Sequence, residues 1–174
     1  METHIENRYI GHTSLEQMRQ LCITLRKAGF GASHTGDLNW GAHMHVQMDP
    51  HRDVRLWTAA DSGELLAFAT YDKKYGVTIE MALTQRQNLA LLSTIVRWAR
   101  AHAAQFQEAG AAPAPMKTSA WDSNAQFGTL LLAAGFTVVS NDLLFSLKRS
   151  LDQEIPAPQL PQAARCGMSM ATAR

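Results

Sequence analysis

The stretch "WDSNAQFGTLLLAAGF", residues 121 to 136, contains both a helix start and a helix stop. Asp122 or Ser123 is the expected N-cap, because either side chain can accept a hydrogen bond from an unpaired backbone N–H of the first turn. Asn124 can serve the same local purpose or reach a ligand. Gly135 followed by Phe136 is typical of a helix end, with a left-handed glycine and an apolar residue packing back on the helix. The stretch therefore predicts one short helix.

The segment ahead of this stretch predicts a longer helix and a strand. From Asn88 onward, apolar residues recur every three or four positions, which is the spacing of one helix face. They are Leu89, Leu92, Val96, Ala99, Ala103 and Phe106. "EAGAAPAPM" ends this helix with glycine and proline, and "KTSAW" at 117–121 is a strand candidate.

Residues 53–83 predict a three-stranded antiparallel meander. Its strands are expected at 53–59, 64–71 and 77–83, separated by turns at 61–63 and 73–76.

The N-terminal part predicts a strand at residues 5–13 followed by a helix at 15–28. Ser14 and Gln17 have the spacing of a capping box, and Gly29 supplies the helix stop. Residues 29–50 have no clear periodicity and are expected to form a long loop with one helical turn at most.

Residues 137–151, "TVVSNDLLFSLKRSL", predict a last strand pair or one long bent strand. The complete order is β-α-loop-β-β-β-α-β-α-β, which predicts an α+β fold with a sheet of mixed direction. We expect a single domain over residues 1–150 and a Pro-rich tail over 151–174, extended or disordered.

The composition limits the possible functions. Of the 174 residues, 46% are hydrophobic and 18% charged, with a net charge near +1, which is ordinary for a soluble globular protein. No apolar run is long enough to span a membrane, and the polar N-terminus is unlike a signal peptide, so a cytoplasmic location is expected. A net charge close to zero argues against a nucleic-acid or membrane partner. Cys22 and Cys166 are expected to be free thiols.

Histidines cluster in the segment that contains His43, His45, Asp49 and His51. A His-x-His pair can bind a metal, but a structural zinc site needs a second ligand pair, and none follows at a suitable spacing. Solvated loop histidines are therefore expected, and no metal site is predicted.

The element order, together with Asn124, Gly135 and Phe136, resembles the GNAT superfamily of N-acetyltransferases over nearly all of residues 5–150. The resemblance implies a mostly antiparallel mixed sheet with helices on both faces. A closer resemblance is to the N-terminal half of tandem GNAT proteins. It lies in "GDLNW" at 36–40, "DVRLWTAADSGELLAFA" at 53–69, "IVRWAR" at 95–100 and "SLKRSLDQEIPAPQLP" at 146–161. It implies a homodimer, or pairing with a second GNAT-like domain, and the chain is then either a single-domain relative or a truncated one.

The resemblance also implies acetyl-CoA as cofactor, bound in a gap between the strands at 77–83 and 116–121. The first backbone N–H groups of the helix from about Gln87 would hold its pyrophosphate. The family usually has glycine at two positions of this loop. Aligned on Gln85, this sequence has Asn88 and Ala90 there; aligned on the apolar pattern of the following helix, which we prefer, it has Arg86 and Asn88, so the phosphate cradle is altered. Asn tolerates a left-handed backbone, and Arg86 can meet phosphate with its guanidinium. The expected cofactor-binding residues are Met81, Ala82, Leu83, Arg86, Gln87, Asn88 and Asn124.

Glu80 is the candidate catalytic residue. In several family members a carboxylate at this strand position draws a proton from the amine, and a half-buried carboxylate has the raised pKa that such a base needs. The alternative is that Glu80 points outward on an alternating strand. Leu131 occupies the position at which many family members have a tyrosine that protonates the leaving thiolate.

Two functions follow from the resemblance. The first is an acetyl-CoA-dependent N-acetyltransferase that acts on a primary amine of a small molecule or peptide. The alternative is a degenerate, non-catalytic GNAT-like module with a structural or partner-binding role, and the two missing glycines and the missing tyrosine favour this alternative.

Overall fold

The computed structural model describes residues 3–44, 48–107 and 115–139. Internal contacts divide the chain into Met1–Thr137 and a second unit, Val138–Arg174, of which only Val138 and Val139 are described. The strands are β1 (His4–Arg8), β2 (Val54–Ala59), β3 (Leu65–Asp72) and β4 (Gly76–Met81). The helices are α1 (His12–Lys27), α2 (Thr35–His43), α3 (Pro50–Asp53), α4 (Leu89–Ala104) and α5 (Ala125–Ala133). Short 3₁₀ turns are η1 (Leu83–Gln85) and η2 (Asp122–Asn124).

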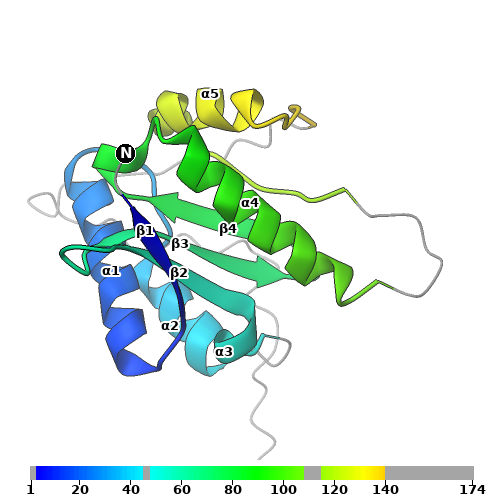
Figure 1. The fold of residues 1–174 in the computed structure, drawn as a ribbon. Helices are drawn as coiled ribbons and strands as arrows, with labels where there is room; N and C mark the ends of the chain where they lie inside the picture. Colours follow the sequence, from blue (N-terminus) through cyan, green and yellow to red (C-terminus); the bar gives the residue numbers. More distant parts are fainter. Residues whose placement is uncertain (1–2, 45–47, 108–114, 140–174) are drawn as a thin grey trace, which may run out of the picture. The chain divides into compact units, whose positions relative to one another are not determined.

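The described strands form an antiparallel sheet in the order β1-β2-β3-β4 (Figure 1). Trp57 pairs with Ala67, and Ala69 pairs with Ile79. The meander predicted for residues 53–83 is confirmed, with each strand within two residues of its expected bounds.

Helices cover both faces of this sheet, as predicted: α1 and α2 lie on one face and α4 on the other (Figure 1). Alternate residues of β4 divide between the faces, because successive side chains of a strand point in opposite directions. Val77 and Ile79 of β4 pack with α4 and α5, whereas Ala82, directly after β4, and Phe68 of β3 pack with α1. The α+β class is confirmed.

The N-terminal part differs from the prediction in three respects. The strand β1 ends at Arg8 instead of residue 13, and α1 begins at His12. Ser14 lies inside α1 and is not its N-cap: its Oγ accepts a hydrogen bond from the backbone N–H of Ile10, 2.9 Å away. The helix stop at Gly29 is confirmed, since this glycine has φ of 84°.

Residues 29–50 are more helical than predicted. Instead of one turn they contain the nine-residue α2, and α3 begins at Pro50. The N-cap of α2 is His34, whose Nδ1 accepts a hydrogen bond from Gly36 N–H at 3.0 Å. Leu38 is the one buried residue of α2. A single buried position has no periodicity, so the sequence does not reveal this helix.

The helix α4 forms as predicted, and α5 forms with one change at its start. Neither Asp122 nor Ser123 is the N-cap of α5. Asn124 is the N-cap, and its Oδ1 accepts from Phe127 N–H at 3.3 Å. At the other end Gly135 has φ of 88°, and Phe136 N–H donates to Leu131 O at 3.1 Å, so the predicted helix stop is confirmed.

Residues 117–121 are extended but do not form the predicted strand. Within the described part of the chain, one backbone hydrogen bond joins them to β4, from Val77 N–H to Lys117 O at 2.9 Å. A Cβ at Gly76 would overlap Lys117 O, so the absence of a side chain permits this close approach. The strand predicted at 137–151 and the tail at 151–174 lie outside the described residues, apart from 137–139, which have no regular structure.

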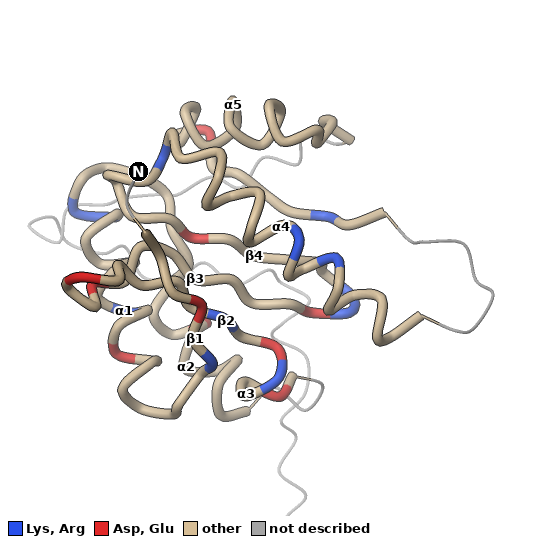
Figure 2. The backbone as a smooth tube through the Cα atoms, viewed as in Figure 1, with Lys and Arg blue, Asp and Glu red and all other residues tan. Residues whose placement is uncertain are grey.

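Acidic and basic residues are interspersed along the described backbone (Figure 2). No helix in the described ranges is long and apolar enough to cross a membrane. Cys22 is a free, fully buried thiol, and burial, with a smaller effect of the nearby Glu80 charge, raises its pKa to about 12. The Cys22 thiol therefore stays protonated at neutral pH and is unreactive.

Candidate functional site

A polar cavity of about 270 Å³ lies between β4 and the extended segment 119–121. Beyond the single bond at Val77 the two segments run in the same direction without further backbone pairing among the described residues, and the cavity occupies the space between them. The start of α5 and the segment between α1 and α2 complete its wall. The lining residues are Arg26, Ser33, His34, Asp37, Thr78, Ile79, Glu80, Ser119, Ala120, Trp121, Asn124 and Phe127.

Glu80 is the buried carboxylate of this cavity, with 6% of its surface exposed. Its Oε1 accepts two hydrogen bonds from Ser33, one from the backbone N–H at 2.7 Å and one from the hydroxyl at 2.8 Å. Among the described residues, none donates a hydrogen bond to Oε2 in this arrangement. The alternative of an outward-pointing Glu80 is wrong, because β4 is covered on both faces and Glu80 points to the face that carries α1 and α2.

Burial raises the pKa of Glu80 above its ordinary value, since a charged carboxylate loses hydration there. The hydrogen bonds from Ser33 and the charges of Arg86 and Arg26 oppose this rise. The net result is a raised pKa, which brings the carboxylate closer to the range in which it can exchange protons near neutral pH.

Arg86 directly follows η1, and only 3% of its surface is exposed. Its guanidinium is stacked on the ring of Phe30, 4.1 Å from the ring centroid. The Nε and Nη1 atoms have no hydrogen-bond partner among the described residues. Burial lowers the pKa of Arg86, and the Glu80 carboxylate opposes that effect. Two buried donors on a cation are thus left unsatisfied, which is costly unless an anionic or polar group meets them.

The start of α4 has few free backbone donors. Asn88 caps the helix, with its Oδ1 accepting from Leu91 N–H at 3.0 Å and its Nδ2 donating to Gln85 Oε1 at 2.7 Å. The backbone N–H groups of Asn88 and Leu89 donate to the carbonyls of Gln85 and Gln87. These three N–H groups are therefore not available as a phosphate cradle in this conformation.

The predicted site residues are divided among several places. Glu80 and Asn124 meet at the polar cavity. Met81 packs in the core on the α4 side, and Arg86, Gln87 and Asn88 line neither this cavity nor the groove described next.

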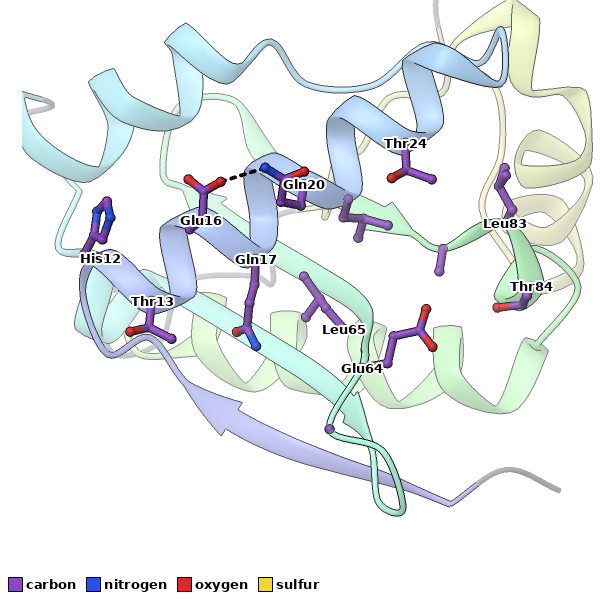
Figure 3. Close-up of a pocket in the computed structure, with 13 residues that line it drawn as sticks. His12, Thr13, Glu16, Gln17, Gln20, Thr24, Glu64, Leu65, Leu83 and Thr84 are labelled. Atoms are coloured by element: carbon purple, nitrogen blue, oxygen red, sulfur yellow. Dashed lines mark hydrogen bonds between the residues drawn. The ribbon is translucent and has the colours of Figure 1, made fainter.

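Ala82 and Leu83 line a separate groove of about 790 Å³ between α1, the turn joining β2 to β3, and η1 (Figure 3). Polar residues of α1, including Glu16 and Gln20, form one wall, and Glu64 lies opposite. Of the predicted cofactor-binding residues, Asn124 lines the cavity, Ala82 and Leu83 line the groove, and the other four line neither.

Several lining residues were not found from the sequence. Ser33 and His34 lie in a segment that the sequence assigns to a loop, and Ser33 is 47 positions from Glu80. Only the folded chain brings them together, although a histidine or serine before "TGD" could have been considered as a helix cap. Among the described residues no group of three or more potential ligands could hold a metal ion; His45 lies outside them.

Comparisons with known proteins find similarity in structure. An aminoglycoside 6'-N-acetyltransferase from Acinetobacter haemolyticus matches with a TM-score of 0.52 and 14% identity, over 84% of this chain and 99% of that one. A GCN5-related N-acetyltransferase from Sphaerobacter thermophilus matches with a TM-score of 0.44 and 15% identity, over 59% of this chain and 32% of that one. This chain therefore spans about a third of the length of the Sphaerobacter protein.

An integron cassette protein from the mobile metagenome of V. cholerae matches with a TM-score of 0.46 and 18% identity, over 84% of this chain and 93% of that one. No protein-family model matches the sequence, and no curated protein matches it. The Acinetobacter match, which extends over most of both chains, shows the fold: this chain has the fold of the GNAT superfamily. The likeness to the N-terminal half of a tandem protein stays a prediction.

The family resemblance implies acetyl-CoA, and two observations bear on whether these residues suit it. The polar cavity between β4 and residues 119–121 lies where the gap was expected. The unsatisfied guanidinium of Arg86 is a donor set that suits a phosphate. Arg86 thus offers the donor chemistry that a phosphate needs, but it does not line the cavity, and its two unpaired nitrogens are buried.

Proposed function

We propose that the protein is an N-acyltransferase that uses acetyl-CoA to acylate a primary amine of a small molecule or peptide. The observation that carries this proposal is the buried carboxylate of Glu80 on the wall of the polar cavity, with one oxygen held by Ser33 and the other unbonded among the described residues.

In this proposal Glu80 is the general base. A primary amine is mostly protonated at neutral pH and must lose a proton before its nitrogen can act as a nucleophile. Oε2 of Glu80 accepts that proton directly or through one water molecule, while Oε1 stays bonded to Ser33. The raised pKa of Glu80 supports the role, because a base is most effective when its pKa is near the working pH.

Arg86 and Asn124 are the residues proposed to hold acetyl-CoA, which supplies the acyl group as a thioester when bound. Arg86 would bind its phosphates, since a guanidinium can make two parallel hydrogen bonds to such a group. Asn124 is buried at the start of α5 and lines the cavity. Leu131 lies in the apolar core, so no tyrosine hydroxyl is present at that position to act as an acid.

The test is binding and turnover with the wild-type protein and Glu80→Gln. We expect acetyl-CoA at 100 times its Kd to stabilise both proteins by ~2.7 kcal/mol in thermal unfolding. We expect release of free thiol with a panel of amines, and a loss of ~10²–10⁴-fold in kcat for Glu80→Gln. Aminoglycosides belong in the panel because the Acinetobacter neighbour is named for acetylating one.

Glu6→Gln is the matched control, since Glu6 is a half-exposed carboxylate of β1 that pairs with Arg55 and does not line the cavity. It should keep wild-type turnover. Absence of any acetyl-CoA shift at millimolar concentration, or full activity of Glu80→Gln, would contradict the proposal.

A second function has an observation in its favour. Asn88 satisfies the first turn of α4 with its own side chain, which suits a GNAT-fold module that no longer binds acetyl-CoA and serves a structural or partner-binding role. Such a module should show no stabilisation by acetyl-CoA and should form a homodimer or a complex with a second domain. Light scattering combined with the acetyl-CoA titration separates the two functions.

A further inference from the structure

Four consecutive residues between α1 and α2, Phe30–Ser33, contact four different parts of the candidate site. The Phe30 ring lies under the guanidinium of Arg86, which directly follows η1. The carbonyl of Ala32 accepts a hydrogen bond from Arg26, which lines the cavity from α1. A short loop therefore connects groups that belong to separate elements.

The remaining two residues of this loop reach the start of α5 and the strand β4. Gly31 N–H donates to Ser123 Oγ at 2.8 Å, and the Trp121 ring lies directly against Gly31. Ser33 donates both its backbone N–H and its hydroxyl to Glu80 Oε1. The same loop that holds the carboxylate is thus fixed to the opposite wall of the cavity.

We propose that Ser33 is a positioning residue for Glu80: its two hydrogen bonds hold Oε1 and leave Oε2 available to the cavity. The use of this geometry in acyl transfer rests on the proposed function, whereas the coupling of Ser33 to Glu80 does not. Two donors on one oxygen restrict rotation of the carboxylate about its terminal bond, which otherwise has a broad distribution of angles. A base held in one orientation needs no reorganisation before it accepts a proton.

Other charged groups also act on Glu80, and the proposal must be separated from them. Arg86 approaches from the end of η1 and Arg26 from α1, and both favour the charged form of Glu80. Cys22 of α1 is close enough for the Glu80 charge to affect it. His34 and Asp37, at the start of α2, line the same cavity. Removal of the Ser33 hydroxyl leaves all of these groups in place.

The first test uses the unaltered protein. In a pH titration followed by NMR, the Ser33 amide ¹H and ¹⁵N shifts should follow the same curve as the Glu80 side-chain carboxyl carbon, because this amide donates directly to that carboxylate. In Glu80→Gln the pH-dependent change at Ser33 should disappear. A Ser33 amide that does not respond while the Glu80 carboxyl titrates would overturn the proposal.

The second test uses Ser33→Ala and Ser33→Thr. Loss of the hydroxyl removes a hydrogen bond to the charged form, so the pKa of Glu80 should rise in Ser33→Ala, and Ser33→Thr should restore it. With a general base, turnover on the acid side of the pH profile should fall by about tenfold in Ser33→Ala, with less change at high pH. KM for acetyl-CoA should be unchanged, because Ser33 is not proposed to bind it.

Ser93→Ala, which removes an exposed serine of α4, is the control and should match the wild type in both measurements. An unchanged Glu80 titration and an unchanged acid limb in Ser33→Ala would overturn the positioning role. If the NMR coupling holds but the wild type acylates no amine, the proposed function fails and the role of Ser33 stands. If turnover depends on Glu80 but not on Ser33, only the positioning role fails.

Discussion

The family resemblance implies glycine at the position of Arg86. This arginine is buried, and among the described residues nothing hydrogen-bonds its Nε and Nη1, which gives opposite expectations for the stability of the free protein and for acetyl-CoA binding. Replacing a poorly paired buried ion by an apolar side chain of similar volume is often neutral or stabilising. In Arg86→Met we therefore expect the free energy of unfolding without ligand to be unchanged or higher by about 1 kcal/mol, while acetyl-CoA binds at least tenfold more weakly.

Thermal unfolding and calorimetry of Arg86→Met measure the two effects separately. Arg97→Met, at an exposed position of α4, should change neither. A large loss of stability with unaltered acetyl-CoA affinity would show that Arg86 is a structural residue and does not hold the cofactor.

Glu80 should reduce stability at neutral pH, because its folded-state pKa is raised by burial. For such a group the stabilising contribution is fully present below the pKa of the unfolded chain, about 4.3, and is lost as the pH rises through the folded pKa. Glu80→Gln removes the charge and keeps a carbonyl oxygen to accept from Ser33. We expect its melting temperature to exceed that of the wild type at pH 8, with the difference shrinking toward pH 4. An equal difference at every pH would contradict the titration argument.

At the scale of elements, the segment between α1 and α2 is interlocked with the start of α5. A Cβ at Gly31 would overlap Cβ, Cγ and Cδ2 of Trp121, so Gly31→Ala must displace either the loop or the indole. We expect Gly31→Ala to weaken the coupling between the Ser33 amide and Glu80 and to lower turnover. Removing the whole obstructing side chain, Cβ included, in the double variant Gly31→Ala/Trp121→Gly should restore the NMR coupling. Independent, additive effects of the two substitutions would contradict a direct contact.

A second connection between elements lies at the other end of α4. Asp53 Oδ1 and His102 Nε2 are 2.8 Å apart, and both side chains are almost fully buried. The ring of Trp98 is stacked on His102, and that of Tyr71 meets it edge-on. This pair ties α4 to the junction of α3 and β2.

Asp53 should make stability depend on pH in the acid range. Burial by itself would raise the pKa of Asp53, but hydrogen bonds from Arg52, the Asp49 backbone N–H and His102 outweigh it, so the pKa is lowered. The associated stability is present above about pH 4, the value for an unfolded aspartate, and is lost as the pH falls through the folded pKa. We expect Asp53→Asn to cost ~2–4 kcal/mol at pH 7 in urea unfolding and to weaken the pH dependence below pH 4. An Asp53→Asn protein as stable as the wild type at pH 7 would contradict this assignment.

The success of the sequence predictions for individual elements follows from how much regular pattern each one has. The helix α4 and the meander were predicted because long apolar periodicities set their faces. The helix α2 was missed because it buries only Leu38. Residues 117–121 were predicted as a strand from their composition, which does not show whether a neighbouring strand forms hydrogen bonds with them.

At the scale of the whole molecule, the order of elements was sufficient to predict the fold class, and resemblance to a family identified Glu80 and Asn124, which meet at one cavity. The rest of the site depends on contacts between distant positions. Ser33 meets Glu80, Gly31 meets Ser123 and Phe30 meets Arg86 only after the sheet and helices have packed. No local pattern in a single sequence encodes such pairings.

Trp121, whose ring contacts Gly31, can serve as an intrinsic fluorescence probe of the polar cavity. Of the four tryptophans in the chain, Trp121 is the one that lines the polar cavity, with 40% of its surface exposed. Trp57 is buried and packs against Trp98, and Trp40 lies on α2. Entry of a ligand should therefore alter the fluorescence intensity or emission maximum of Trp121, and Trp121→Phe should remove that signal. Binding of unlabelled compounds could then be followed in real time without a coupled assay.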